Sequence, residues 1–252
     1  MIPKILYQTW DTNMFAKSVK KRLEIIKQNY TGYNYQFFLD NDMDTFVETH
    51  YPGEIWECYK KLNIIVAKVD FWRYLVLYKF GGVYLDIDSD LRWHLDDMIQ
   101  EGDDAIISAE TNPGIFVQWM LAFRAGHPIL KRVIEIVVLN IKQNKYPNDI
   151  HKMTGPSAFT EAVQGVHQEL FGECLQHNKI ELGDDVTYEK NEVKYRVLGV
   201  DYNGFVTCKI PECFILFEGR RKWHHMQKEQ ELLKDVEVQS SISSSSQEQA
   251  KP

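Results

Sequence analysis

The chain has 252 residues, of which 44% are hydrophobic, so it is long enough to bury the core of one complete domain. Its net charge of −7 argues against a general nucleic-acid-binding protein, whose surface needs an excess of Lys and Arg. No run of about twenty apolar residues occurs, so we expect no membrane-spanning helix, and no signal-peptide pattern opens the chain. The cysteines, Cys58, Cys174, Cys208 and Cys213, lack metal-binding spacing and are expected to be free thiols.

The first part of the chain alternates strand and helix patterns. A buried strand at 4–8 is followed by an amphipathic helix at 18–28 and a second strand at 33–39. This order predicts parallel strands joined by a right-handed crossover, and hence an α/β fold with a mostly parallel sheet. Two short helices at 42–50 and 51–62 then lead into the most specific stretch of the sequence.

That stretch, residues 64–90, predicts a helix, a turn and a strand. Apolar residues recur at helical spacing until a Gly-Gly pair, which ends the helix because glycine tolerates the left-handed conformation. A strand at 83–88 is expected to follow. On it the side chains of Asp86 and Asp88 leave the same face, roughly 6.6 Å apart along the chain. They lie at the carboxyl end of the strand, where open α/β sheets bind their ligands.

Paired carboxylates at such a position favour a divalent cation. Two neighbouring carboxylates repel each other unless a positive group lies between them. Mg²⁺ or Mn²⁺ bound by Asp86 and Asp88, together with substrate phosphates, would satisfy both groups. The alternative is that these acids, with Asp90, lie on a solvated strand end, since Asp-X-Asp is a common tripeptide. The preceding helix and Gly-Gly stop favour the cation site.

The run AKVDFWRYLVLYKFGGVYLDIDSDL resembles the signature of the DXD-motif sugar transferases grouped as glycosyltransferase family thirty-two. The opening IPKILYQTW is similar to the first strand of that family. The family includes fungal outer-chain and sphingolipid mannosyltransferases and bacterial capsule enzymes, and it is distantly similar to the sugar-transferring domain of large clostridial toxins. The resemblance covers the first half of the chain well and the rest loosely. It implies a GT-A-like, Rossmann-type sheet flanked by helices.

The resemblance also implies roles for particular side chains. Asp70 and Arg73 would hold the sugar and ribose hydroxyls of a nucleotide-sugar donor, and with Asp86 and Asp88 they would form the catalytic group. An ion pair between Asp70 and Arg73, three residues apart on a helix, is the simpler alternative. Other expected donor contacts are Gln8, Thr9, Trp10, Gly82 and Asn112.

For two of these residues, an alternative to the implied role stays open. Trp10 would stack on the donor base, although a tryptophan that follows a strand often fills the core instead. His224 would be a third metal ligand, because His224-His225 aligns with a His-His-Trp pattern in relatives. Relatives continue that pattern with Ser-Trp, which this chain lacks, so a solvated basic cluster is the alternative.

These expectations predict a metal-dependent glycosyltransferase. It would move a sugar from a UDP- or GDP-sugar to a hydroxyl of a glycan, a glycolipid or a protein glycan, with retention of configuration. The sequence offers no carboxylate nucleophile for a double displacement, so transfer on the front face is compatible. The main alternative is a non-catalytic protein of the same fold that binds a sugar nucleotide or a glycan. A metal-dependent hydrolase or nucleotidyltransferase is a third possibility, but it would usually need a second carboxylate cluster.

The remainder of the chain is expected to complete the same domain, residues 1–238. Residues 239–252 are rich in Ser and Gln and too polar to pack, so we expect a disordered tail there. Without a membrane anchor, the resemblance favours a soluble cytoplasmic enzyme of bacterial or viral type, or one of the Golgi lumen if the chain is trimmed. The further expected elements are a strand at 104–109, helices at 129–143 and 158–170, and strands at 194–200, 204–208 and 213–217.

Overall fold

The computed structural model describes residues 1–12, 14–15, 17–90, 94–110, 114–176, 179–181, 184–199, 208–209 and 223–234. The side chains of residues 18, 22, 90, 208–209 and 223–225 are outside the description as well. Asn112, the predicted strand at 213–217 and the predicted tail at 239–252 therefore lie outside the described residues.

The described strands form a seven-stranded sheet and a separate two-stranded one. The large sheet has the order β2-β1-β3-β6-β5-β8-β7, and the small one pairs β4 with β9. In the large sheet β1 pairs in parallel with β2 and β3, and β5 pairs in parallel with β8, whereas β6 and β7 run antiparallel to their neighbours. The predicted mostly parallel α/β fold is confirmed. The strands are β1 (Ile5–Thr9), β2 (Asn34–Phe38), β3 (Gly82–Leu85), β4 (Ser89–Asp90), β5 (Ala105–Ser108), β6 (Met120–Phe123), β7 (Asp185–Lys190), β8 (Val193–Leu198) and β9 (Cys208–Lys209).

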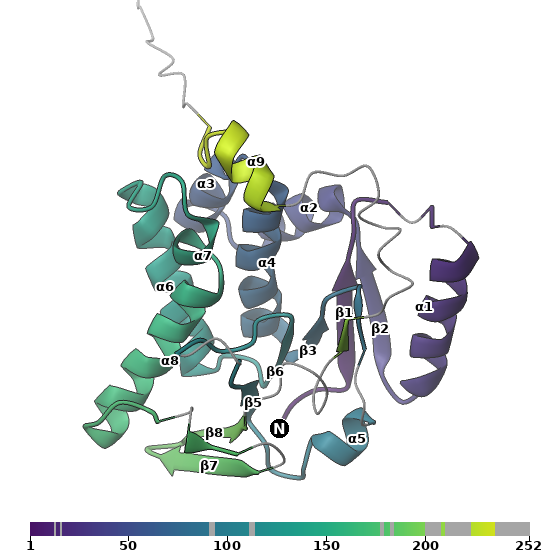
Figure 1. Ribbon diagram of the computed structural model, residues 1–252, viewed down its shortest axis with the longest axis vertical. Helices are drawn as coiled ribbons and strands as arrows, with labels where there is room; N and C mark the ends of the chain where they lie inside the picture. The colour runs from purple at the N-terminus through teal and green to yellow at the C-terminus, as the bar shows by residue number, and fades with distance from the viewer. Residues whose placement is uncertain are drawn as a thin grey trace, which may run out of the picture.

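Helices cover both faces of the large sheet (Figure 1). One face packs against α2, α3, α4, α6, α7 and α8, and the other packs against α1 and α5. Successive strand residues alternate between the two faces, as the pleat requires: Tyr84 belongs to the first core, and Val83 and Leu85 belong to the second. The helices are α1 (Lys17–Asn29), α2 (Asp40–His50), α3 (Glu54–Lys61), α4 (Ile65–Phe80), α5 (Leu95–Met98), α6 (Pro128–Lys142), α7 (Ile150–Met153), α8 (Pro156–Phe171) and α9 (Trp223–Glu229).

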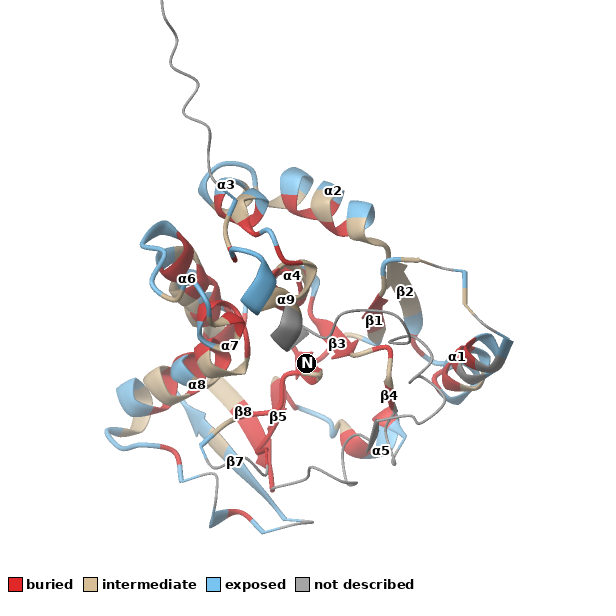
Figure 2. Cartoon of the chain, turned by 45° about the horizontal axis from the view of Figure 1, so that its top comes forward, coloured by how far each residue is buried: buried red, intermediate tan, exposed pale blue. Residues whose placement is uncertain are grey.

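Helix α4 is buried along most of its length, and strands β3 and β5 of the large sheet are also buried, as their red colour in Figure 2 shows. Every residue from Asp70 to Leu77 is buried, and these include the charged residues Asp70 and Arg73. The helix lies between the sheet and α6, with which it makes extensive contact. At its end Gly81 has φ +68°, and a side chain there would collide with the backbone of Phe123. Gly81 therefore ends the helix as predicted.

The strand predicted at 83–88 is too long. β3 ends at Leu85, and Asp86 begins a turn that the Ser89 N–H closes on the Asp86 carbonyl at 3.0 Å. The neighbouring strand β6 starts at Met120, opposite Leu85, and one further backbone bond follows, from the Asp86 N–H to the Trp119 carbonyl at 2.8 Å. Asp86 and Asp88 therefore extend from a turn at the carboxyl end of β3, and not from one face of a straight strand.

Two strands of the large sheet were not predicted. β6 is a four-residue apolar segment that inserts antiparallel between β3 and β5, and such a short run is ambiguous from sequence alone. β7 is a largely exposed edge strand that pairs only with β8 among the described strands. Of the strand predicted at 204–208, only Cys208 is described, at the start of β9. Among the described residues, no helix combines the length and the apolar character that crossing a membrane requires.

The C-terminal described segment docks on the helical side of the molecule. Leu233 forms a β-bridge with Leu62, and the Asn63 N–H donates to the Leu232 carbonyl at 2.9 Å. Leu232 is buried in the main core. These contacts fix the end of α9 beside the junction of α3 and α4 (Figure 1).

Candidate donor-binding site

The site forms where β3 ends beside α4. The Tyr84 hydroxyl of β3 donates to Asp86 Oδ1 at 2.8 Å. The guanidinium carbon of Arg73, on α4, lies 4.5 Å from the centroid of the Tyr84 ring. Because Tyr84 faces the main core, this contact brings the first aspartate of the motif to the α4 side of the sheet. Strand and helix together position the aspartate next to a buried cation.

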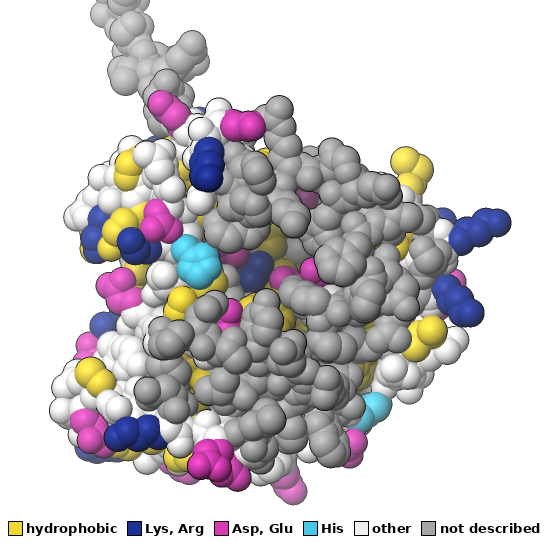
Figure 3. Space-filling model, in the orientation of Figure 1, with side chains coloured by type: hydrophobic (Ala, Val, Ile, Leu, Met, Phe, Trp, Pro, Cys, Tyr) yellow, Lys and Arg dark blue, Asp and Glu magenta, His cyan; other side chains and the backbone are white. Residues whose placement is uncertain are grey.

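Arg73 connects both predicted acidic residues of the site. Its Nη2 atom lies 3.2 Å from Asp70 Oδ1 and 3.7 Å from Asp86 Oδ1. Arg73 and Asp70 are buried, whereas the side chain of Asp86 is 28% exposed. The predicted ion pair between Asp70 and Arg73 is therefore present, and it extends to Asp86. Figure 3 shows acidic and basic side chains together near the centre of one face.

A hydrogen-bonded frame surrounds this pair. The Thr154 hydroxyl donates to Asp70 Oδ2 at 3.1 Å, and Arg73 Nη1 donates to the Gln118 carbonyl at 3.0 Å. The Gln118 amide in turn donates to the Tyr74 hydroxyl, which donates to the Thr154 carbonyl at 3.0 Å. Five buried residues from α4 and two loops thus hold one another in place. Within the described chain the Arg73 Nε atom is buried without a hydrogen-bond partner.

Burial sets the ionisation of the two central groups. It raises the pKa of Asp70 to about 6, although Arg73 and the Thr154 hydroxyl favour the ionised carboxylate. For Arg73, burial opposes the charge, but Tyr84, Asp70 and Asp86 raise its pKa above the ordinary value. Arg73 therefore stays charged, and Asp70 changes its charge near neutral pH.

The predicted residues of β1 lie near this edge of the sheet in different ways. Gln8 is fully buried; its Nε2 donates to the Asp86 carbonyl at 3.3 Å, and its Oε1 accepts from the Tyr35 hydroxyl at 3.0 Å. The Thr9 hydroxyl donates to the Phe38 carbonyl of β2 at 2.8 Å. Gln8 thus supports the backbone of the DXD motif. A direct donor contact by Gln8 or Thr9 stays a prediction.

Trp10 is half-buried at the end of β1 and packs partly against the second core. The backbone N–H of Trp10 donates to the Phe38 carbonyl at 3.2 Å, and this bond continues the β1–β2 ladder by one step. Partial burial fits a side chain with one face in the core and another toward a ligand. Base stacking by Trp10 stays a prediction.

Gly82 has a packing role that the sequence reading missed. It lies at the start of β3, four residues before Asp86, about 13 Å away by strand rise. A side chain at Gly82 would come within 2.8 Å of the Ile5 carbonyl, and its φ is +111°. Close approach of β1 and β3 explains why this position is a glycine. A donor contact by Gly82 stays a prediction.

The residues present suit a cation that also binds a substrate. Asp88 follows Asp86 in the turn and accepts from the Ser89 hydroxyl at 3.4 Å. Among the described residues no cluster of three or more His, Cys, Asp or Glu side chains forms. Mg²⁺ commonly uses one or two carboxylates and takes its remaining oxygens from water and phosphates, so two aspartates fit. The predicted third ligand, His224, belongs to α9, but its side chain is outside the description.

Three residues of the site were not predicted from the sequence: Tyr84, Gln118 and Thr154. Tyr84 has the same strand parity as Asp86 and Asp88, and this parity could have identified it as a neighbour of the aspartates. Gln118 lies just before β6, and Thr154 follows α7, more than eighty residues from Asp70. No local pattern links such distant residues.

Several known proteins are similar to this chain in sequence, and a solved structure is similar to it in fold. Residues 12–105 match the family model "Glycosyltransferase sugar-binding region containing DXD motif". Inositol phosphoceramide mannosyltransferase 3 of Schizosaccharomyces pombe is 30% identical over 133 residues, which cover 53% of this chain and 36% of that protein. The initiation-specific alpha-1,6-mannosyltransferase of Candida albicans is 26% identical over 200 residues, covering 64% and 52%. An uncharacterized glycosyltransferase of Acanthamoeba polyphaga mimivirus is 29% identical over 170 residues, covering 65% of each chain.

The solved structure "PaToxG Glycosyltransferase" superposes with a TM-score of 0.53 at 19% identity, covering 68% of this chain and 71% of that one. At this identity the likeness concerns the fold. The chain spans about half, or less, of the length of the two fungal relatives described above. The matched segment contains α4, β3 and the aspartates of the DXD motif, and it extends to the start of β5. The segment that holds Asp70, Arg73 and the DXD aspartates is therefore similar to the glycosyltransferase sugar-binding region that contains a DXD motif.

Proposed function

We propose that the protein transfers a sugar from a nucleotide-sugar donor to a hydroxyl group of a glycan or glycolipid acceptor, with a divalent metal ion. One observation carries this proposal: Arg73 lies buried between Asp70 and Asp86 at the carboxyl end of a parallel strand. Ligands of open α/β sheets bind at that end. Several relatives are mannosyltransferases by name, so a mannosyl nucleotide is the first donor to test.

The donor would span the site from Trp10 to Asp70. Asp70 and Arg73 offer a hydrogen-bond acceptor and a set of donors to the hydroxyls of the sugar and ribose, while Trp10 offers a ring to the base. Arg73 also brings a positive charge toward the diphosphate, where negative charge develops as the bond to the sugar breaks. Tyr84 and Gln8 fix the side chain and the backbone of Asp86.

Asp86 and Asp88 would hold Mg²⁺ or Mn²⁺, which when bound neutralises charge on the leaving diphosphate. We propose that the configuration at the sugar is retained. Transfer on the front face is compatible, with the acceptor hydroxyl giving its proton to the leaving phosphate oxygen. The residues around Arg73 then act by holding the donor and excluding water from it, rather than by attacking the sugar.

The test is hydrolysis of nucleotide sugars in the absence of acceptor, because water can replace the acceptor hydroxyl. We expect one sugar nucleotide in a panel of UDP-, GDP- and CMP-sugars to be hydrolysed with Mn²⁺ and not with EDTA. Saturation-transfer NMR with the same panel, with and without Mn²⁺, reports donor binding separately. Binding without hydrolysis or transfer would instead indicate a non-catalytic sugar-nucleotide-binding protein of this fold.

A further inference from the structure

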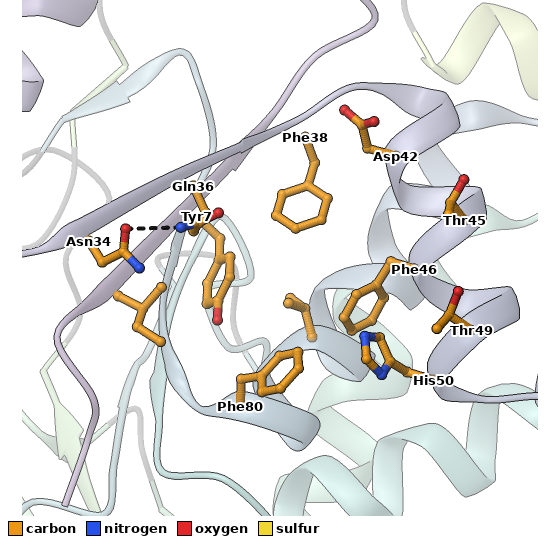
Figure 4. A pocket seen from close by; sticks show the side chains of 12 residues that line it. Tyr7, Asn34, Gln36, Phe38, Asp42, Thr45, Phe46, Thr49, His50 and Phe80 are labelled. Carbon is orange, nitrogen blue, oxygen red and sulfur yellow. Dashed lines mark hydrogen bonds between the residues drawn. The ribbon is translucent and has the colours of Figure 1, made fainter.

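A second pocket lies away from the DXD motif, between the edge of the sheet and α2. It has a volume of about 480 Å³ and is open to solvent (Figure 4). Strand β2 is an edge of the large sheet, so the pocket lies along that edge. We call it the edge groove; it is lined by Ile5, Tyr7, Asn34, Gln36, Phe38, Asp42, Thr45, Phe46, Thr49, His50, Val76 and Phe80.

The edge groove has an aromatic wall. Phe80 is 42% exposed, an unusual state for a large apolar side chain at the end of a buried helix. Its ring lies 6.1 Å from that of Phe46 and 5.4 Å from that of His50, measured between centroids. Phe38 and Tyr7 continue the wall on the sheet side, as Figure 4 shows. Contacts among these rings hold Phe80 in place while part of its surface faces solvent.

The rim of the edge groove is polar and carries little charge. Gln36 donates through Nε2 to Asn34 Oδ1 at 2.9 Å, which leaves the Gln36 carbonyl as an acceptor and the Asn34 amide nitrogen as a donor. Thr45 and Thr49 present hydroxyls from α2, and Asp42 presents a carboxylate that accepts from the Leu39 N–H. The twelve lining residues include no Lys or Arg. An anionic ligand such as a phosphate or nucleotide would therefore find no lysine or arginine there, and it would meet the carboxylate of Asp42.

We infer that the edge groove binds a neutral carbohydrate. A pyranose ring has an apolar C–H face that packs on an aromatic ring and a rim of hydroxyls that bond to amides, hydroxyls and carboxylates. The volume lies within the range of about 300–1,000 Å³ typical of small-ligand pockets. That this carbohydrate is the acceptor glycan rests on the proposed function. Phe80 lies ten residues beyond Asp70 on α4, about 15 Å by helix rise, so an extended oligosaccharide is long enough to reach both places.

Oligosaccharide binding without donor and without metal tests this inference. The probes are α-1,6-linked mannotriose and cellotriose, titrated into the full chain and followed by saturation-transfer NMR and calorimetry. We expect at least one to bind with a millimolar dissociation constant. Phe80→Ala should weaken that binding by about tenfold or more, which corresponds to about 1.4 kcal/mol. Thr49→Val, which keeps the side-chain size and removes an exposed hydroxyl, should weaken it by a smaller factor.

Leu139→Ala is the matched control, because Leu139 is a 50% exposed apolar side chain on α6 that does not line the edge groove. It should leave the affinity unchanged. The inference is overturned if neither probe binds, or if Phe80→Ala binds as tightly as the wild type. It is also overturned if sedimentation shows a dimer that Phe80→Ala dissociates, because a second copy would then occupy the groove. Since these assays contain no donor, a protein that binds the probe but hydrolyses no sugar nucleotide refutes only the proposed function.

Discussion

Two buried arginines, at opposite parts of the sheet, have carboxylate partners but differ in how completely they are bonded. Arg196 of β8 donates through Nε and Nη2 to Asp103, at 3.3 and 2.7 Å, and through Nη1 to Asp185 at 2.9 Å. Its Nη2 also donates to the Met98 carbonyl. Arg73 pairs with Asp70 and Asp86 at longer distances, and its Nε has no partner among the described residues.

This difference in hydrogen bonding distinguishes an arginine that stabilises the fold from an arginine that can bind a ligand. A buried arginine in which every nitrogen donates to the protein joins elements of the fold, as Arg196 of β8 joins β7 and the turn before β5. A buried arginine with a spare donor carries a cost that a ligand can relieve. By burial and charge alone, Arg73 and Arg196 would be equally good candidates for a ligand-binding residue. The hydrogen-bond partners distinguish them.

The largest expected effect comes from removing each arginine in turn. Arg196→Met leaves Asp103 buried without its cation, and we expect a loss of about 3–5 kcal/mol in the free energy of unfolding, measured by urea denaturation. Arg73→Met should cost less stability, because Asp70, whose pKa is already raised to about 6, can take up a proton. It should abolish donor binding. If instead Arg73→Met unfolds the protein as readily and its folded fraction binds donor normally, both arginines are structural.

A carboxylate from each cluster gives a second matched pair. Asp86→Asn should lower sugar-nucleotide hydrolysis by at least about a hundredfold without changing the melting temperature, because it removes a ligand of the metal and a partner of Arg73. Asp185→Asn also neutralises an acid beside a buried arginine, but far from the DXD motif, and should leave hydrolysis unchanged. Wild-type turnover by Asp86→Asn in excess EDTA would refute the metal assignment.

Trp10→Ala tests whether the donor base lies beside the first strand. Base stacking is worth about 1–3 kcal/mol, so we expect the donor dissociation constant to rise by roughly ten- to a hundredfold. Since Trp10 is only half-buried, the melting temperature should fall little. A loss of about 3–5 kcal/mol in stability with normal donor affinity of the folded fraction would show that Trp10 is a core residue.

The smallest expected effect is a pH dependence centred on Asp70. Donor binding should weaken as the pH falls below about 6, because the protonated carboxyl loses the charge that makes it a strong acceptor for hydroxyls and that attracts Arg73. Protonation of Asp70 has the opposite effect on stability, because it favours the folded protein. The folded pKa is raised from 3.8 to about 6, so this group's contribution to stability is largest below pH 3.8 and is lost as the pH rises through about 6.

Calorimetric donor titrations and urea melts between pH 5 and 8 measure the two quantities. Asp70→Asn should remove both dependences, because its side chain does not titrate. A wild-type donor affinity that stays constant across this range would contradict a role for ionised Asp70 in binding.

Local patterns predicted the framework of the molecule. The helical spacing and the Gly-Gly stop gave α4 and its end, and the alternation of strand and helix gave the parallel core of the sheet. The acidic pair was expected at the end of this strand, and the spacing of Asp70 and Arg73 predicted their ion pair; the family resemblance implied that these residues share a site. Each of these is set by neighbours within a few residues along the chain, which is the range over which side-chain periodicity carries information.

Long-range packing decided the rest. The turn that ends β3 depends on β6, a short strand whose antiparallel insertion no local pattern shows. Thr154 and Gln118 reach the buried ion pair only because α7 and the loop before β6 pack against α4. The close approach of Gly82 to Ile5, which gives this glycine a packing role, also became visible only in the structure. The sequence by itself determined which charged residues come to the carboxyl end of β3. Only the tertiary structure decided which of their hydrogen bonds are already made, because those partners come from segments far apart in the chain.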